Sequence, residues 1–285
     1  MAVGIFAHNE EANIVCAVTS VLSSQVELVK LKEIVVVSSG SFDRTNHLVR
    51  EMMKKDKRIK LYDEAERHGK SAAINLFLQR IKTPVAVTMS ADLKLSPKAL
   101  EEIGRPFLNP DIGMVGAHPV PHNLTRSEIG AEIKLLWELH HLVSLKQPKC
   151  GEVVAFRNII RQIPHDSAVD EATIEVLLRM LGYSVVYAPL AIVYNKGPRT
   201  IPEFLTQRRR VQAGHQWVFT TYNYRVSTMV FGNLIQVVMA ELIAHPRSTW
   251  PLMRLVGLEI LAQMLGWIDY YILGRNPYKW QMIKR

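Results

Sequence analysis

Short runs of β-branched residues alternate with helical patterns along the first half of the sequence, and this alternation limits the choice of fold. Residues 33–37 (Glu-Ile-Val-Val-Val) form a nearly continuous apolar run, which is typical of a strand covered on both faces. Residues 84–89 form another such run, and a helical pattern over 70–81 precedes it. This order predicts an α/β fold, with a Rossmann-type, mostly parallel sheet and helices on both of its faces.

The other elements follow from the same patterns. Apolar residues on one face indicate a helix, and short apolar runs between turn residues indicate a strand. We expect strands over 3–7, 33–37, 59–62, 84–89 and 184–188, and helices over 11–24, 43–54, 70–81, 97–103 and 127–145, with a further helix ending at 181.

Polar segments follow several of the predicted strands directly. They cover residues 7–11, 38–43 and 90–92. In open α/β sheets, ligands bind beyond the carboxyl ends of the strands. We therefore expect these segments to share one site.

Composition narrows the class of protein. A hydrophobic content of 48% over 285 residues excludes intrinsic disorder, and two cysteines exclude a disulfide framework. The formal net charge of +9 suits phosphate-bearing partners, such as nucleotides, nucleic acid or an anionic membrane surface. Met1 leads straight into the first predicted strand without a signal-peptide pattern, so we expect a cytoplasmic location.

Six polar motifs occur in order along the chain. They are Phe-Ala-His-Asn-Glu-Glu at 6–11, Val-Ser-Ser-Gly-Ser-Phe-Asp-Arg-Thr at 37–45, Gly-Lys-Ser-Ala-Ala-Ile-Asn at 69–75, Thr-Met-Ser-Ala-Asp-Leu-Lys-Leu-Ser-Pro at 88–97, Val-Asp-Glu at 169–171 and Gln-Arg-Arg-Arg-Val at 207–211. This order resembles the family-2 glycosyltransferases of the GT-A fold, in the branch of the cellulose, chitin and hyaluronan synthases. The resemblance implies an inverting transfer of a sugar from a nucleotide diphosphate to an acceptor.

The resemblance also implies which residues bind the nucleotide-sugar. His8 holds the position that stacks on the base, and two serines replace the family's paired acids at 38 and 39, which leaves the base open. A UDP-sugar is the expected donor. The first motif also suits a helix N-terminus, with Asn9 as its cap. The expected nucleotide-sugar contacts are Ala7, His8, Asn9, Glu11, Ser38, Gly40, Lys70, Ser90, Ala91, Asp92, Gln207 and Arg208.

The fourth motif resembles the Asp-x-Asp segment that binds Mg²⁺ or Mn²⁺ in the family. Asp92 is the acid that remains, since Ser90 stands in place of the first one. We expect a weakened metal site in which Asp92 and diphosphate oxygens hold the cation. As an alternative, the charge of Lys94 partly replaces the cation.

The remaining motifs imply catalytic and acceptor-binding residues. Asp170 and Glu171 resemble the acids that include the general base, and the distance to Gly182-Tyr183 favours Glu171. The resemblance implies that Arg210 stabilises the leaving diphosphate. Val211 replaces the family's tryptophan, which argues against processive synthesis. Residues 150–157 resemble a stretch bordering the acceptor site, with Gly151 and Arg157 as the expected contacts.

The C-terminal third is apolar but interrupted by charges. Residues 228–244 and 251–273 are expected to form amphipathic helices at a membrane interface, with Glu259, Gln263 and Asp269 on one stripe. Alternatively, these helices pack on the catalytic domain or on a second subunit. We expect a catalytic domain over 1–222 and a helical, membrane-associating region over 223–285, so that the protein sits peripherally or monotopically at the cytoplasmic face of the cell membrane.

The sequence thus predicts an inverting glycosyltransferase of polysaccharide biosynthesis that acts on a saccharide or a lipid-linked acceptor. Two alternatives remain. One is a polyprenyl-phosphate sugar synthase, which the apolar C-terminal third favours and the motif at 207 opposes. The other is a catalytically degenerate protein that binds a nucleotide-sugar or glycan. Nucleic acid is not an expected partner, because no recognition motif surrounds the arginines. The donor sugar, the linkage and the oligomeric state are left open.

Overall fold

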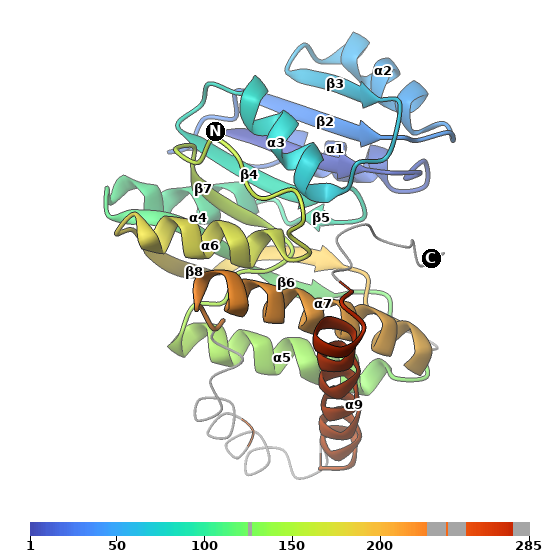
Figure 1. Ribbon diagram of the computed structural model, residues 1–285. Coiled ribbons are helices and arrows are strands. Elements are labelled where there is room, and N and C mark those ends of the chain that lie inside the picture. The colour runs from blue at the N-terminus through green and yellow to red at the C-terminus, as the bar shows by residue number, and fades with distance from the viewer. Residues whose placement is uncertain (125–126, 227–237, 239–248, 276–285) are drawn as a thin grey trace.

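A mixed β-sheet with the strand order β3-β2-β1-β4-β7-β6-β8-β5 forms the centre of the protein (Figure 1). The computed structural model describes residues 1–124, 127–226, 238 and 249–275. The strands are β1 (Ala2–Ala7), β2 (Glu33–Ser39), β3 (Ile59–Glu64), β4 (Val85–Ser90), β5 (Lys94–Leu95), β6 (Ile112–Pro121), β7 (Val154–Arg157) and β8 (Ser184–Asn195). The helices are α1 (Ile14–Leu22), α2 (Thr45–Lys55), α3 (Lys70–Arg80), α4 (Ala99–Gly104), η1 (Arg105–Leu108), α5 (Gly130–Lys146), α6 (Asp170–Met180), α7 (Ile201–Tyr222), α9 (Thr249–Trp267) and η4 (Ile268–Ile272).

The sheet is parallel where the sequence pattern alternates strand and helix. β1 pairs in parallel with β2 and β4, and β2 with β3. Beyond β4 the sheet is mixed, because β7 runs antiparallel to both β4 and β6, whereas β6 and β8 are parallel. The predicted α/β fold with a mostly parallel sheet is confirmed. The sequence analysis missed β6, whose glycines and prolines resemble those of a loop (Ile-Gly-Met-Val-Gly-Ala-His-Pro-Val-Pro).

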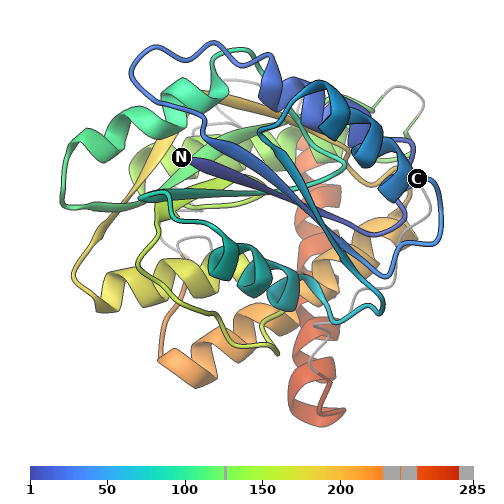
Figure 2. The ribbon, with the colours of Figure 1, turned by 90° about the horizontal axis from the view of Figure 1, so that it is seen from above.

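Helices cover both faces of the sheet, as Figure 2 shows from above. Successive side chains of a strand point to opposite faces. In β2, Ile34 and Val36 therefore pack in the core under α1, α2 and α4, whereas Val35 and Val37 pack in the core under α3 and α6. Both faces of the sheet are covered by apolar side chains. The polar residues therefore lie beyond the ends of the strands.

The helices α5, α7 and α9 lie together beyond β6 and β8 (Figure 1). An apolar cluster that includes Ile133, Phe204 and Leu252 joins them, and Arg254 of α9 lies 2.9 Å from a carboxylate oxygen of Glu132 on α5. The predicted helix over 251–273 is present as α9 and η4. The predicted helix over 228–244 lies outside the described residues.

The two acids of the predicted stripe, Glu259 on α9 and Asp269 on η4, face the rest of the protein, whereas Gln263 is exposed. Glu259 pairs with Arg208 of α7, and Asp269 pairs with Arg209. The opposite side of α9 exposes large apolar side chains, among them Trp250, Met253 and Met264. This helix therefore packs on α5 and α7, in line with one of the alternatives, and still presents an apolar face outward.

Candidate functional site

The polar segments that follow β1, β2 and β4 meet at one edge of the sheet. Nδ1 of His8 lies 2.7 Å from the carbonyl oxygen of Ser39, and the backbone N–H of Asn9 donates to Oγ of Ser41 at 3.0 Å. On the other side of β1, the N–H of Ala91 donates to the carbonyl oxygen of Phe6. Adjacent parallel strands end at the same edge, so these contacts follow from the register of the sheet.

The loop after β2 is held in a fixed shape around Gly40. This residue has φ 64°, and a Cβ there would lie 2.9 Å from the backbone nitrogen of Arg67, so glycine is required on both counts. Ser38 is fully buried, and its hydroxyl donates to Oγ of Ser41 at 2.8 Å. Because its hydroxyl donates to Ser41, Ser38 has only its acceptor lone pairs left for a base.

Exposed side chains surround the same loop. Glu11 pairs with Arg44 at 3.2 Å in solvent, and its backbone N–H donates to Asp43. Phe42 is 87% exposed, and its ring centroid lies 6.4 Å from that of His8. An exposed aromatic ring can stack on a base, so Phe42 joins His8 as a candidate for this contact. The sequence analysis quoted Phe42 without assigning it a role.

Lys70 joins the predicted phosphate-binding and catalytic motifs directly. Gly69, at φ 96°, ends the preceding loop so that α3 begins at Lys70. Nζ of Lys70 lies 2.9 Å from Oδ2 of Asp170 and 3.1 Å from Oε1 of Glu171, both in the first turn of α6. A cation and two acids from segments a hundred residues apart therefore form one buried group.

This group has unusual electrostatics. Burial raises the pKa of the Asp170 carboxyl to about 6, with the like charge of Glu171 adding to the effect, although Lys70 opposes both. Burial by itself would lower the pKa of Lys70, but the charges of Asp170 and Glu171 outweigh it and raise that pKa. The pKa of Asp170 therefore lies in the range where a general base operates.

A cavity of about 490 Å³ opens in front of this group. It lies between the carboxyl end of β4, the first turn of α6 and the helices α5, α7 and α9. The predicted site residues that line it are Lys70, Ser90, Asp92, Gly151, Asp170, Glu171, Gln207, Arg208 and Arg210. The predicted contacts at Ala7, His8, Asn9, Glu11, Ser38, Gly40 and Ala91 do not line it and lie along the neighbouring edge of the sheet.

The arginines of α7 are tied to the C-terminal helix. Nε of Arg208 lies 2.6 Å from Oε1 of Glu259, and both side chains are mostly buried. Arg209 donates from Nε and Nη2 to the two carboxylate oxygens of Asp269. Gln207 and Arg210 line the cavity. The guanidinium donors of an arginine also bind diphosphate oxygens. In this structure Glu259 occupies those donors of Arg208.

Comparison with known proteins identifies the family of the chain. The family described as Glycosyl transferase family 2 matches residues 2–163, which is more than half of the chain. The chain belongs to glycosyl transferase family 2. The match covers β1 to β7, including the segments that follow β1, β2 and β4, and so confirms the resemblance inferred from the motifs.

Curated relatives and solved structures agree with the family. The poly-β-1,6-N-acetyl-D-glucosamine synthase of Staphylococcus epidermidis is 23% identical over 284 residues, which cover 93% of this chain and 66% of the relative. The synthase of Staphylococcus aureus strain COL is 23% identical over 239 residues, or 79% of this chain and 57% of the relative. The chain thus spans two thirds or less of the length of these relatives.

Solved structures of low identity show the fold alone. The mannosyltransferase PcManGT from Pyrobaculum calidifontis, in complex with GDP-Man and Mn²⁺, superposes with a TM-score of 0.67 at 18% identity, over 96% of this chain and 86% of that one. TarS of S. aureus, residues 1–349, gives 0.53 at 14% identity, over 96% and 91%. Both likenesses extend beyond the match to the family and include the helices around the cavity.

Two residues expected in the site of this family-2 protein lie elsewhere. Arg157, predicted to contact the acceptor, donates from Nε and Nη2 to backbone carbonyls of Ile112, Phe107 and Asn109, and it does not line the cavity. It ties β7 to the start of β6. Lys94 is exposed on β5 and does not line the cavity, and the alternative in which its charge partly replaces the cation stays a prediction.

Oxygen donors suited to a divalent cation lie near Asp92. Glu152 also lines the cavity, and burial, followed by the nearby charge of Asp92, raises its pKa to about 7. Nδ2 of Asn195 donates to Oε1 of Glu152 at 3.1 Å. Among the described residues, no group of three or more acidic, histidine or cysteine side chains could hold a metal ion. These residues fit a cation shared with a diphosphate, which supplies the further oxygen ligands.

The two adjacent histidines of α5 point to different places. His140 lines the cavity, whereas Nδ1 of His141 lies 2.8 Å from the hydroxyl of Tyr187 and its ring stacks on His118. This separation follows from the helical spacing of neighbouring residues. His140 and the cavity residues Lys149 and His215 had no assigned role in the sequence, because only the fold brings them together.

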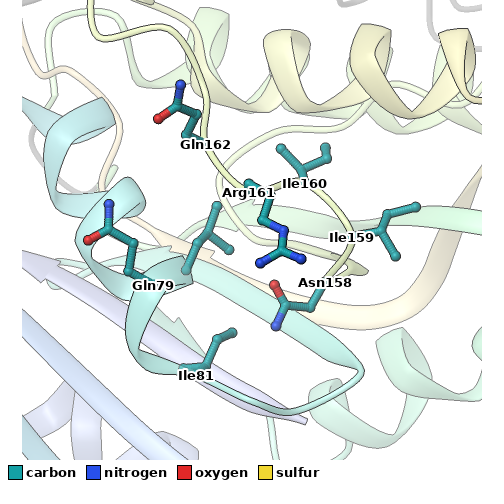
Figure 3. A pocket seen from close by; sticks show the side chains of 8 residues that line it. Gln79, Ile81, Asn158, Ile159, Ile160, Arg161 and Gln162 are labelled. Atoms are coloured by element: carbon teal, nitrogen blue, oxygen red, sulfur yellow. The ribbon is translucent and has the colours of Figure 1, made fainter.

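A second hollow, of about 710 Å³, lies away from these residues. Figure 3 shows its lining side chains, which come from the C-terminal end of α3 and from the segment after β7. Arg161 is its one charged residue, and no predicted site residue lines it. We assign it no part in the chemistry.

Proposed function

We propose that the protein transfers a sugar, with inversion, from a nucleoside diphosphate sugar to an acceptor hydroxyl. The observation that carries this proposal is the meeting of Lys70, Asp170 and Glu171 in the same cavity as Asp92 and Arg210. An inverting transfer needs a base, charges that stabilise a leaving diphosphate, and one space for both substrates. Family membership supports the class of reaction, and the complexes of the neighbours with GDP-Man and with UDP support a nucleotide donor.

Glu171 acts as the base in this proposal. It takes the proton from the acceptor hydroxyl as the oxygen attacks the anomeric carbon, and the bond to the diphosphate breaks on the opposite side. Asp170 is the more buried of the two acids. It therefore holds Lys70 in place, while Glu171 faces the substrate. Lys70 and Arg210 stabilise the charge that develops on the leaving diphosphate.

The cofactor would be Mg²⁺ or Mn²⁺. Asp92 is the residue that holds it, together with oxygens of the donor, and the bound cation would neutralise the diphosphate. The mannosyltransferase neighbour contains Mn²⁺, which supports divalent-metal use. Because the protein supplies few ligands, cation affinity should depend on the nucleotide.

The outward face of α9 supports membrane association. The helix over Thr249–Ile272 is long enough and apolar enough to cross a membrane. Of its most apolar 18-residue stretch, 22% is buried within the protein. Since its acids Glu259 and Asp269 bind α7, the helix would lie along the surface of the bilayer with Trp250 and Trp267 in the interface. We place the protein at the cytoplasmic face, with residues 223–285 as its membrane-associating region and 1–222 as its catalytic domain.

The experiment that tests the function measures donor hydrolysis and transfer by the purified protein. Candidate donors come from a thermal-shift screen of nucleoside diphosphates and their sugars, since a ligand that binds the native state raises the Tm. Glu171→Gln should abolish turnover and leave donor binding intact. Glu138→Gln, an exposed acid on α5 outside the cavity, is the matched control.

Two outcomes would contradict the proposal. If turnover survives Glu171→Gln but not Asp170→Asn, then Asp170 is the base and Glu171 is not. Donor binding without turnover, in every metal tested, would favour the degenerate binding protein over the enzyme.

A further inference from the structure

Lys196 is a cavity residue to which the sequence analysis assigned no role. It directly follows β8 and lines the cavity together with Asp92 and Glu152. Its side chain also reaches the segment after β1, because Nζ donates to Oδ1 of Asn13 at 2.6 Å. Asn13 itself does not line the cavity. Lys196 therefore connects the two parts of the site, which are the cavity with the catalytic acids and the sheet edge with the predicted nucleotide contacts.

The end of β8 holds this lysine in position. The side chains of Asn195 and Lys196 diverge, as expected of successive residues at the end of a strand. Nδ2 of Asn195 donates to Oε1 of Glu152, just before β7, whereas Lys196 bonds to the residue that precedes α1. The carbonyl oxygen of Asn195 accepts from the backbone N–H of His122 at 3.1 Å, which ties this end of β8 to the residue after β6. The side chain of Lys196 therefore extends from a backbone that neighbouring strands hold in place.

An acid does not neutralise the charge of Lys196 in the part of the chain that the structure describes. Its hydrogen-bond partner there is the neutral amide oxygen of Asn13. Lys70 and Arg208, which line the same cavity, are instead paired with carboxylates. An ammonium group has three N–H donors, and the described residues engage one of those of Lys196. A half-buried cation without an acidic partner suits an anionic ligand, because burial of an unpaired charge is costly.

The donor of the proposed function would bring such an anion to Lys196. In that proposal the nucleotide lies along the sheet edge, and the anomeric carbon lies near Glu171 in the cavity. The diphosphate joins these two parts of the donor and carries its negative charge. The segment expected to bind the metal has one acid, Asp92, because Ser90 stands where the family has another. A cation from the protein at this place would offset the weaker hold on Mg²⁺ or Mn²⁺.

We propose that Lys196 binds the diphosphate of the donor and shares the neutralisation of its charge with the divalent cation. This inference rests on the proposed function and adds a donor-binding residue from the end of β8. Nζ keeps its hydrogen bond to Asn13, and its other N–H groups donate to phosphate oxygens. Since lysine and cation share the charge, removing the metal should leave part of the affinity for the diphosphate.

Calorimetric titrations of the purified protein test the contact. The probes are UDP, GDP and inorganic pyrophosphate, each titrated with saturating Mn²⁺ and with a chelator. In the chelator, Lys196→Gln should weaken the binding of pyrophosphate, and of UDP or GDP, at least about tenfold, because a charge-assisted hydrogen bond is lost. Lys196→Arg keeps the charge and should retain most of the affinity. Unchanged affinity in Lys196→Gln would overturn the contact.

The comparison between Mn²⁺ and chelator separates a shared charge from a structural role. With Mn²⁺ bound, the loss in Lys196→Gln should shrink to about threefold or less, because the cation then neutralises most of the charge. A loss of the same size in both conditions would overturn the sharing of charge.

Two further variants serve as controls. Lys134→Gln, an exposed lysine on α5 outside the cavity, should leave all affinities unchanged. Asn13→Ala removes the protein partner of Nζ and should retain most of the affinity for pyrophosphate. If Asn13→Ala loses as much affinity as Lys196→Gln, then Lys196 only braces the segment after β1 and does not bind the diphosphate.

A measurement on the wild-type protein keeps the proposal falsifiable if Lys196→Gln does not fold. Acetylation of lysines by an amine-selective reagent, followed by mass spectrometry, reports how accessible each ammonium group is. Pyrophosphate should slow the acetylation of Lys196 at least about threefold and leave that of Lys134 unchanged. Equal rates for Lys196 with and without pyrophosphate would overturn the contact.

The proposed function and this inference fail in different ways. If no nucleoside diphosphate of the thermal-shift screen binds the wild type, the proposed function fails, and the anion contact of Lys196 is judged by pyrophosphate. If UDP or GDP binds the wild type and Lys196→Gln equally well in the chelator, the proposed function stands and the role of Lys196 is wrong.

Discussion

The two sides of the site are built in different ways. On the sheet side, backbone hydrogen bonds between strands fix the segments that follow β1, β2 and β4, and the His8–Ser39 and Ala91–Phe6 contacts are part of this framework. On the helical side, ion pairs between side chains join α7 to α9, as in Arg208–Glu259. The sheet side is therefore held mainly by the strand register, whereas the helical side depends on charged side chains of two helices.

This difference teaches where substrate specificity can change. The carboxyl ends of parallel strands always lie along one edge of the sheet, and ligands bind there. This edge therefore suits the part that all donors share, which is the nucleotide with its diphosphate. The helical side consists of side chains on packed helices, which can vary without disturbing the sheet. In our proposal the acceptor, which differs among glycosyltransferases, lies on that side. The predictions below test this division, beginning with the group that connects the two sides.

Removing the connecting lysine should have the largest effect. Lys70→Met deletes the ion pairs to Asp170 and Glu171 and leaves two buried acids side by side, so we expect kcat/KM to fall by at least about a hundredfold. Steady-state kinetics with the identified donor measure this change. Lys82→Met, an exposed lysine just after α3, is the control. A loss of less than tenfold would mean that the two sides are not coupled through Lys70.

The pH dependence should reveal the paired acids. Because the pKa of Asp170 is raised to about 6, activity should rise with pH up to about that value and then level off, about tenfold per unit on the acid limb. Asp170→Asn should remove this limb, since the group whose pKa is about 6 is gone, and pH–rate profiles of the two proteins measure the change.

Stability should change in the opposite direction over the same range. A carboxyl whose pKa is raised by folding contributes stability that is complete below its ordinary pKa and is lost as the pH rises through about 6. Urea unfolding from pH 4 to 7 measures this loss. A stability that rises over this range in the wild type, and equally in Asp170→Asn, would contradict the assignment.

Breaking the helical side should cost stability. Arg208→Ala leaves Glu259 without its partner in a mostly buried place, so we expect the free energy of unfolding to fall by about 2 kcal/mol. Arg50→Ala, which breaks an exposed pair with Asp63, should cost about 0.5 kcal/mol. Urea denaturation of both variants makes the comparison. Equal losses would show that the Arg208–Glu259 pair is no stronger than a surface pair.

A comparable loss of stability is expected on the sheet side, where a glycine substitution probes the loop after β2. Gly40→Ala combines a positive φ with a close contact to the backbone of Arg67, and should cost about 2 kcal/mol and weaken nucleotide binding. Gly182→Ala has a positive φ and open space around it, so it should cost about 1 kcal/mol and leave nucleotide binding unchanged. Nucleotide binding that is insensitive to Gly40→Ala would remove this loop from the donor site.

Much of the sheet could be predicted, for a physical reason. Strands buried on both faces must be apolar throughout, as in residues 33–37, and the helices between them must carry one apolar face, so the local pattern is strong. The sequence analysis missed β6 because its glycines and prolines are typical of a loop. The strand pairs with β7 and β8, which are distant in sequence, so local patterns do not reveal it. The polar segments at the strand ends were also predictable, since their position follows from strand direction.

The composition of the cavity was not predictable in the same way. The motifs identified Asp92, Lys70, Asp170 and Glu171 one by one, and the fold brought them to one place. Arg157 was identified from a motif in the same way. Its guanidinium, however, donates to a backbone carbonyl outside the cavity.

The sequence by itself determined the order of strands and helices and the chemical types at the strand ends, because these depend on neighbours within a few residues. Only the tertiary structure decided that Glu259 of α9 faces α7, and that Lys149, His140 and His215 face a shared cavity. Such contacts join residues from separate helices, and the direction in which each helix presents its side chains is set by packing against the others.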